Sequence, residues 1–411
     1  MTLFGRGCAA IRGDRAMAER LGWARRRRSD PDPDVVLEPR AGDGRAEPWI
    51  APPGWRPFPG PEALWRRGRV RGGWTYLAGI PGVARYLERL AAPRGAGGAR
   101  VGLIGLGRVG GTAAAVLASL PSGRSGVAEL LIDDADAANR ERWLLELQAV
   151  AQWKGPHPGP RVAPATPEAM FRACDAVLFA AAEAVPPIGH EGDVRMCQLE
   201  PNRAILAPVL AAARRAEFAG LFLVVSDPVE WLAQAAFRDS NAGRGGRFTG
   251  EGIAPERIAG LALGVMWGRA LACARRRGWL EAVNRRGAAY GPHSTDVAVF
   301  DDLRAPNPGR CAVLSAAARE GNFALRDIGH LPYVGPAISS VALALPRLLS
   351  GREVLASVWL GGIYFGAPAR LRWGVLPAAR PMAGSVRAEL TDLHGRLAAR
   401  RAELGMDFST Q

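Results

Sequence analysis

Short apolar runs alternate with longer stretches in which apolar residues recur every three to four positions between residues 99 and 256. The short runs predict buried strands, and the stretches with helical spacing predict helices. The predicted strands are Val101–Ile104, Glu129–Asp133, Cys174–Ala182 and Leu221–Pro228. Because predicted helices follow these strands, the pattern favours an α/β fold with a doubly wound parallel sheet.

The pattern changes after residue 257. Apolar residues at helical spacing predict a helix that ends at Arg277 and further helices over residues 310–320, 337–349 and 385–404. Strands are predicted at Ala282–Tyr290 and Val297–Phe300, and a β-meander is predicted over residues 354–375. This mixture predicts an α+β domain over residues 257–405, which follows the doubly wound domain of residues 99–256.

Residues 1–98 differ in composition from the rest of the chain. They contain turns rich in proline and tryptophan, such as Pro52–Trp55, and four consecutive arginines at positions 25–28. Apolar residues at helical spacing predict one helix over Trp74–Ala91. We expect part of this basic extension to pack on the main body or on another subunit, because its tryptophans are unusual for a disordered tail.

A glycine-rich turn, Gly105-Leu-Gly-Arg-Val-Gly110, follows the first predicted strand. Between a strand and a helix, such glycines permit a tight turn, bring the backbone close to a pyrophosphate and let the helix pack on the strand. Asp133 ends the next predicted strand, where a carboxylate suits the ribose hydroxyls of NAD and repels the 2′-phosphate of NADP. The sequence therefore predicts a Rossmann-type domain that binds NAD. The predicted cofactor-binding residues are Gly105, Gly107, Arg108, Val109, Gly110, Asp133, Ala181 and Ser226.

The formal charge of the chain is +14, but its arginines are mostly dispersed and Lys154 is its single lysine. This distribution argues against nucleic-acid binding as the main function. No apolar run reaches the roughly 20 residues needed to span a bilayer, and the N-terminus lacks the apolar core of a signal peptide. We therefore expect a cytoplasmic protein without a membrane role. The five cysteines show no CxxC spacing, which fits a reducing compartment and predicts no thiolate metal site.

From residue 100 to residue 404 the order of motifs resembles the lactate/malate dehydrogenase family. The glycine turn and Asp133 are followed by Val224-Val-Ser-Asp-Pro-Val-Glu230, by Arg257-Ile-Ala-Gly260 and then by a histidine-containing loop. The resemblance implies a Rossmann domain, an α+β substrate domain, NAD as cofactor, and a homodimer or homotetramer. It further implies that the protein interconverts a 2-hydroxy acid and a 2-keto acid by hydride transfer. The basic extension lies outside the resemblance.

The resemblance also implies roles for individual side chains. His293 occupies the position of the histidine that gives or takes the proton, a task that suits an imidazole near neutral pH. Arg195 occupies the position of the arginine that polarises the substrate carbonyl, and Arg269 that of the arginine that grips the carboxylate. Gly189 stands where the family separates lactate from malate enzymes. A small residue there leaves room for a larger side chain on the substrate.

One family residue is missing from this chain. Met266 stands where the family has the aspartate that orients the histidine, and Asp227 stands where the family has an asparagine. Our hypothesis is that Asp227 takes over this task and stabilises protonated His293, because loss of an orienting carboxylate is costly in other histidine-dependent enzymes.

Two alternatives stay open at this stage. The changes at Met266 and Asp227 also fit a catalytically impaired relative that keeps the NAD site and acts as a sensor or scaffold. A different NAD chemistry that uses a metal would need a Cys/His pair near the nicotinamide, and Cys197 and His190 are the local candidates.

Overall fold

The computed structural model describes most of the chain after residue 97 and, before it, the backbone of five short strands. The described ranges are residues 98–122, 126–152, 159–183, 193–247, 249, 251–321, 323–330, 333–371, 374–378 and 380–407.

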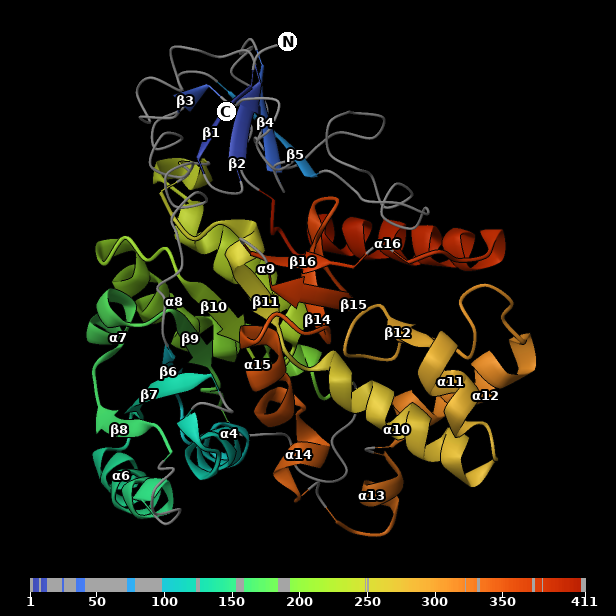
Figure 1. Cartoon of the computed structure of the whole chain (residues 1–411), viewed down its shortest axis with the longest axis horizontal. Coiled ribbons are helices and arrows are strands. Elements are labelled where there is room, and N and C mark those ends of the chain that lie inside the picture. Colours follow the sequence, from blue (N-terminus) through green and yellow to red (C-terminus); the bar gives the residue numbers. More distant parts are fainter. Residues whose placement is uncertain are drawn as a thin grey trace.

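Six parallel strands form the larger part of the nine-stranded sheet (Figure 1). They are β6 (Ala99–Ile104), β7 (Val127–Asp133), β8 (Arg161–Pro164), β9 (Ala176–Phe179), β10 (Leu221–Val224) and β11 (Ile258–Gly260). Their order across the sheet is β8-β7-β6-β9-β10-β11. Numbered from β6 along the chain, this is the order 3-2-1-4-5-6 of a Rossmann fold. The predicted fold class is confirmed, with the topological switch point between β6 and β9.

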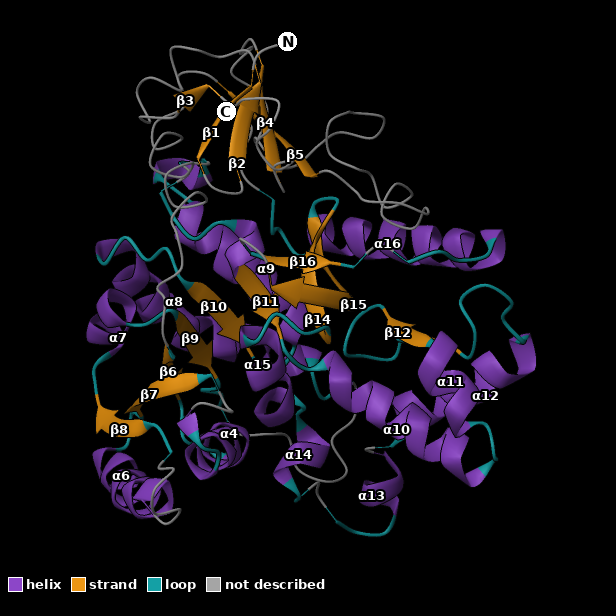
Figure 2. Ribbon diagram, in the orientation of Figure 1, coloured by secondary structure: helices purple, strands orange, loops and turns teal. Residues whose placement is uncertain are grey.

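Helices cover both faces of the parallel strands, as Figure 2 shows. One group contains α4 (Arg108–Ser119) and α6 (Ala137–Gln152), which contact each other. The other group contains α7 (Pro167–Ala173), α8 (Leu199–Arg215) and α9 (Val229–Asn241), in which each helix contacts the next. α4 begins at Arg108, so Gly110 and Gly111 lie inside its first turn.

Three antiparallel strands extend the same sheet beyond β11. They are β14 (Val354–Leu360), β15 (Ile363–Leu371) and β16 (Val375–Pro377). β14 joins the parallel part through the pair formed by Gly260 and Ser357, where an added Cβ at Gly260 would lie 3.0 Å from the Ser357 Cβ. The nine-stranded sheet therefore continues past residue 257.

The remaining elements of the second half lie around this extension. A two-stranded hairpin pairs β12 (Ala288–Tyr290) with β13 (Ala298–Phe300), and His293 lies in the connection between these strands. The helices are α10 (Leu263–Arg276), α11 (Leu280–Arg286), α12 (Pro308–Glu320), α13 (Phe323–Asp327), α14 (Gly335–Ile338), α15 (Val341–Leu349) and α16 (Gly384–Glu403). A second apolar cluster forms between α10, α12 and the hairpin.

Two predictions from the apolar pattern are wrong in part. The predicted strand over residues 282–290 is a helix up to Arg286, and only Ala288–Tyr290 is extended. Gly287 separates the two because an added Cβ there would lie 2.4 Å from the Phe300 carbonyl oxygen. The helix predicted over residues 337–349 is interrupted at Ser339, whose backbone is extended.

The prediction of a helix over residues 74–91 is also wrong at its start. Gly72–Leu77 forms a strand, β5, and the rest of that range lies outside the described residues. β5 belongs to a five-stranded sheet of order β3-β1-β2-β4-β5. The other strands are β1 (Leu3–Arg6), β2 (Ala9–Arg12), β3 (Ala24–Arg25) and β4 (Val35–Arg40).

The sequence analysis missed β8, which falls in a proline-rich connection. It is an edge strand and ends at Pro164, a position where proline removes no bond needed by the sheet. The apolar signal is weak there because only Val162 of this strand is buried.

The core of the parallel sheet contains an aromatic cluster centred on Phe222. Its side chain is fully buried on β10, and its ring centroid lies 6.1 Å from that of Phe171 and 6.3 Å from that of Phe179. These residues come from β9, β10 and α7, so the cluster holds helix and sheet together.

We expect Phe222→Ala to lower the free energy of unfolding by about 3–5 kcal/mol, because it removes buried apolar surface and leaves a cavity. Urea denaturation monitored by circular dichroism would measure the change. Leu343→Ala is the control, because Leu343 is 61% exposed on α15 and its loss should change stability by no more than about 0.5 kcal/mol. Equal effects of the two substitutions would contradict the role of the cluster.

Candidate active site

The carboxyl ends of the parallel strands meet at one edge of the sheet. Ile104 at the end of β6 pairs with Asp133 on β7 and with Phe179 on β9. Val224 at the end of β10 pairs with Phe179 and with Gly260 on β11. The loops that follow these strands therefore begin at the same level, which is where α/β sheets bind ligands.

The glycine turn is the first of these loops. Gly105 has a φ of +95°, and an added Cβ there would lie 2.4 Å from the Ala181 backbone nitrogen. An added Cβ at Gly110 would lie 1.9 Å from the Gly105 carbonyl oxygen, so any side chain would push α4 away from β6. At Gly107, by contrast, a Cβ would meet nothing within 4 Å. The turn is closed on the protein side and open at Gly107.

The N-terminus of α4 faces this open space. Gly107 is its N-cap, and no side chain caps the first turn. Arg108 and Val109 begin the helix, and Arg108 is exposed, with its guanidinium 5.7 Å from the centre of the Tyr333 ring. Free N–H groups at a helix start attract anions through the helix dipole.

Three acidic residues lie at the end of β7. The Asp133 carboxylate forms an ion pair with Arg140 on α6, at 3.1 Å between Oδ1 and Nη1. Burial raises the pKa of Asp133, and the hydrogen bond from Arg140 offsets part of this increase. Asp134 accepts the backbone N–H of Leu106 in the glycine turn at 2.6 Å, and Asp136 accepts the N–H groups of residues 138 and 139 at the start of α6. Asp134 thus ties β7 to the glycine turn, a contact that the sequence analysis missed.

Asn202 on α8 joins the loops after β9 and β10. Its Oδ1 accepts the N–H of Glu183 at 2.9 Å, and its Nδ2 donates to the Asp227 carbonyl at 2.6 Å. Close by, the hydroxyl of Ser226 donates to the Ala181 carbonyl at 2.7 Å. The fold thus brings together Ala181 and Ser226, two of the residues predicted to bind cofactor.

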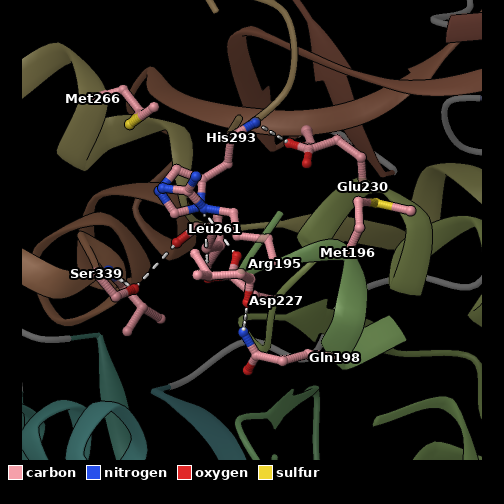
Figure 3. A network of polar contacts seen from close by, with 12 residues as sticks. Arg195, Met196, Gln198, Asp227, Glu230, Leu261, Met266, His293 and Ser339 are labelled. Carbon is pink, nitrogen blue, oxygen red and sulfur yellow. Dashed lines mark hydrogen bonds and ion pairs between the residues drawn. The ribbon is translucent and has the colours of Figure 1, made fainter. Parts of the chain in front are cut away.

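His293 and Asp227 are in direct contact (Figure 3). The imidazole Nδ1 lies 3.2 Å from Oδ1 of the carboxylate. The His293 side chain is 6% exposed, while that of Asp227 keeps 30% of its surface in solvent. The other ring nitrogen, Nε2, is buried and has no hydrogen-bond partner among the described residues. Figure 3 also shows Met266 near this group, where it offers no carboxylate.

Two arginines act on the same carboxylate. Nε of Arg195 lies 3.8 Å from Oδ2 of Asp227, and Arg195 is almost fully buried. Partial burial would raise the pKa of Asp227, but the attraction of His293, a hydrogen bond with its ring, and the positive charges of Arg195 and Arg269 together lower this pKa. Asp227 therefore carries a negative charge over the whole neutral range.

Arg269 lies on α10, one turn after Met266. Its Nη1 donates to the Met266 sulfur at 3.5 Å and to the Ala318 carbonyl at 3.4 Å. Burial and repulsion by Arg195 lower its pKa to about 10, and the charge of Asp227 opposes this shift. The Arg269 guanidinium therefore stays protonated at neutral pH.

The backbone before α8 fixes the position of Arg195. The Asp193 carboxylate accepts the N–H of Arg195 at 2.9 Å and that of Met196 at 3.2 Å. The Gln198 side chain donates to the Val194 carbonyl at 2.6 Å. Gly189 and His190, by contrast, lie outside the described residues.

Two general features complete the description of the site. Within the ranges that the structure describes, no three His, Cys, Asp or Glu side chains come together as a metal site. None of the helices in those ranges combines the length and the apolar character needed to cross a membrane.

No protein-family model matches this sequence, and neither does any curated protein. Solved structures do match. MGS-M5, a lactate dehydrogenase from a Medee basin deep-sea metagenome library, is 18% identical, with a TM-score of 0.58 over 75% of this chain and 100% of its own. The minor L-lactate dehydrogenase of Enterococcus mundtii is 18% identical, with a TM-score of 0.57 over 73% and 96%.

A malate dehydrogenase is equally similar. That of Plasmodium falciparum is 14% identical, with a TM-score of 0.60 over 74% of this chain and 98% of its own. The matching share of this chain is about as large as the part, residues 100–404, in which the sequence motifs resemble the same enzymes. The chain therefore has the fold of lactate and malate dehydrogenases.

Proposed function

We propose that this protein is an NAD-dependent oxidoreductase that interconverts a 2-hydroxy acid and a 2-keto acid. The observation that carries the proposal is the contact between Asp227 and His293, 3.2 Å apart, with Arg195 beside the same carboxylate. The structural neighbours, which are lactate and malate dehydrogenases, agree with this chemistry.

The residues at the sheet edge fit a dinucleotide. Open space at Gly107 lets a pyrophosphate approach the backbone, and the uncapped start of α4 offers N–H groups to it. Asp133, oriented by Arg140, is the acceptor for the ribose hydroxyls, and the neighbouring Asp134 and Asp136 add negative charge that repels a 2′-phosphate. These carboxylates favour NAD over NADP. When bound, the nicotinamide would exchange a hydride with C2 of the substrate.

His293 is the proposed acid and base. In the reduction of the keto acid it gives a proton to the carbonyl oxygen, and in the reverse direction it takes the hydroxyl proton. Nε2 is the atom available for this exchange, because Nδ1 is engaged by Asp227 and Nε2 has no partner among the described residues. A neighbouring carboxylate favours the imidazolium form, so Asp227 performs the task that Met266 cannot.

The two arginines hold the anionic substrate. Arg269 is largely removed from water and repelled by Arg195, so a substrate carboxylate between these groups would relieve the repulsion. We propose that Arg269 grips the carboxylate and that Arg195 polarises the carbonyl, as the resemblance implies. Guanidinium groups suit the first task because they bind carboxylates in a bidentate manner. The proposed tolerance for a bulky side chain rests on Gly189.

A spectrophotometric assay tests the central proposal. Protein and NADH are mixed with a panel of 2-keto acids that differ in side-chain size, and we expect at least one acid to oxidise NADH. The near-ultraviolet absorbance of NADH measures turnover, and a thermal-shift experiment in parallel measures binding. Stabilisation by NADH without oxidation by any acid would contradict the enzyme proposal and favour an NAD-binding sensor or scaffold.

The choice between the two cofactors depends on Asp133. We expect Asp133→Asn to weaken NADH binding by about tenfold, since it removes a charged hydrogen-bond acceptor for the ribose, and to reduce the preference over NADPH. Fluorescence titration with both nucleotides would measure this. Glu141→Gln is the matched control, because it removes an exposed carboxylate on the same helix as Arg140. A variant that keeps the full NADH preference would refute the assignment.

The role of Asp227 is visible in the pH dependence of turnover. Its lowered pKa keeps Asp227 ionised throughout the neutral range, so a change of rate in that range does not come from protonation of this carboxylate. We expect Asp227→Asn to lower kcat by about 100-fold or more and to flatten this profile, because the imidazolium loses its partner. Stopped-flow rates from pH 5 to about pH 9 would measure both effects.

Asp239→Asn serves as the control for this substitution. Asp239 lies on α9 and accepts two hydrogen bonds from Arg203, at 2.8 and 3.0 Å, so its loss breaks an ion pair away from His293. The control should lower stability and leave the pH profile unchanged. If Asp227→Asn keeps the wild-type rate at every pH, the replacement hypothesis is wrong.

A further inference from the structure

A second carboxylate, close to Asp227 in the sequence, contacts the backbone of His293. Glu230 lies three residues after Asp227, in the first turn of α9, and is 4% exposed. Its Oε1 accepts the backbone N–H of His293 at 2.9 Å and the hydroxyl of Ser357 at 2.6 Å (Figure 3). The segment from residue 227 to residue 230 thus contacts both the ring and the backbone of one histidine.

The burial of Glu230 is not explained by an ion pair. No cation lies within 4.0 Å of its carboxylate in the part of the chain that the structure describes. A buried carboxylate is costly unless hydrogen bonds and nearby positive charge compensate it. Its position at the start of α9 supplies part of the compensation through the helix dipole, and the two donated hydrogen bonds supply more.

The loop that carries His293 is fixed at two points. Gly291, with a φ of +90°, donates its N–H to the carbonyl of Gly366 on β15 at 2.9 Å. Two residues later, the N–H of His293 donates to Glu230. Ser357, the other donor to Glu230, is fully buried on β14. The first contact ties the loop to the antiparallel extension of the sheet, and the second ties it to α9 as well.

We propose that Glu230 is a positioning residue for His293. It sets the place of the backbone from which the imidazole reaches Asp227 at 3.2 Å. α10 supplies no carboxylate to the ring, because its sequence holds no Asp or Glu and Met266 stands where the family has its aspartate. The inference rests on the proposed function, since positioning matters only if His293 exchanges a proton. A displacement of about 1 Å at such a group can cost about 100-fold in rate.

The test compares three variants by steady-state kinetics with NADH and whichever 2-keto acid the wild type reduces. Glu230→Leu removes the acceptor, and Glu230→Gln keeps an acceptor oxygen without the charge. Gln234→Leu is the matched control, because Gln234 is 1% exposed one turn further along α9 and the described residues show no hydrogen bond or ion pair between it and His293. We expect Glu230→Leu to lower kcat by about 100-fold with an unchanged Kd for NADH. Glu230→Gln should restore most of the rate, and the control should keep it.

A second measurement needs no turnover. Nuclear magnetic resonance of protein with labelled histidines follows the titration of His293, assigned by its absence in His293→Gln. We expect Glu230→Leu to shift this titration and Glu230→Gln to restore it, because the contact with Asp227 depends on the backbone position. If no keto acid is reduced, the proposed function fails while this titration still decides the role of Glu230.

Two outcomes would overturn the inference. One is a folded Glu230→Leu variant with wild-type kcat and wild-type His293 titration. The other is an equal loss of rate in Gln234→Leu, which would show a general effect of altering α9. If Glu230→Leu fails to fold, Ser357→Ala takes its place, because it removes one of the two donors that fix Glu230. An unchanged His293 titration in Ser357→Ala would then refute the inference.

Discussion

The alignment of the parallel strand ends is the constraint on which the site depends. Ile104, Phe179 and Val224 lie level with one another across three adjacent strands. The residues after them therefore begin their loops at one edge of the sheet: Gly105, Ala180 and Val225. A slip of one residue in any of these pairs would turn the following side chains to the other face. The register thus positions both the glycine turn and Asp227.

Asp227 joins two parts of the chain that are distant in sequence. It follows β10 in the parallel half, while His293 lies in a hairpin of the second half. The family places its histidine-orienting carboxylate on a helix one turn before the arginine, where this chain has Met266. In this chain the carboxylate at the end of β10 lies beside Arg195 as well, so one negative charge faces both an imidazole and a guanidinium. Its remaining exposure to solvent weakens each attraction relative to a fully buried pair.

The sequence predicts β6, β7, β9 and β10 because each of these strands is a short apolar run followed by a helical pattern. It fails where local chemistry competes with the pattern. At Gly287 a close approach of the Phe300 carbonyl ends a helix inside a run that resembles a strand. At β8 two prolines make an edge strand resemble a connecting loop in the sequence. At β5 the tryptophan that suggested an amphipathic helix belongs to a strand.

The site was predictable to the extent that its residues stand in ordered motifs. The motif order implies that four residues come together: His293, Asp227, Arg195 and Arg269. The distance between Asp227 and His293, by contrast, could not be predicted, because 66 residues separate them in the sequence. Asp134 and Asn202 carry no motif signal, because their contacts are to backbone groups of other loops. Such contacts depend on the fold and are invisible in one sequence.

Placing both stabilising carboxylates on one segment has a physical consequence. Asp227 and Glu230 share the turn that leads from β10 into α9, so any shift of that turn moves the ring contact and the backbone contact of His293 together. The shared turn is tied to α8 through the hydrogen bond from Asn202 to the Asp227 carbonyl. The geometry of the imidazole therefore depends on the packing of α8 and α9 as well as on the strand register. The contacts to His293 therefore run through the parallel sheet and its helices, while α10 offers Met266 and no carboxylate.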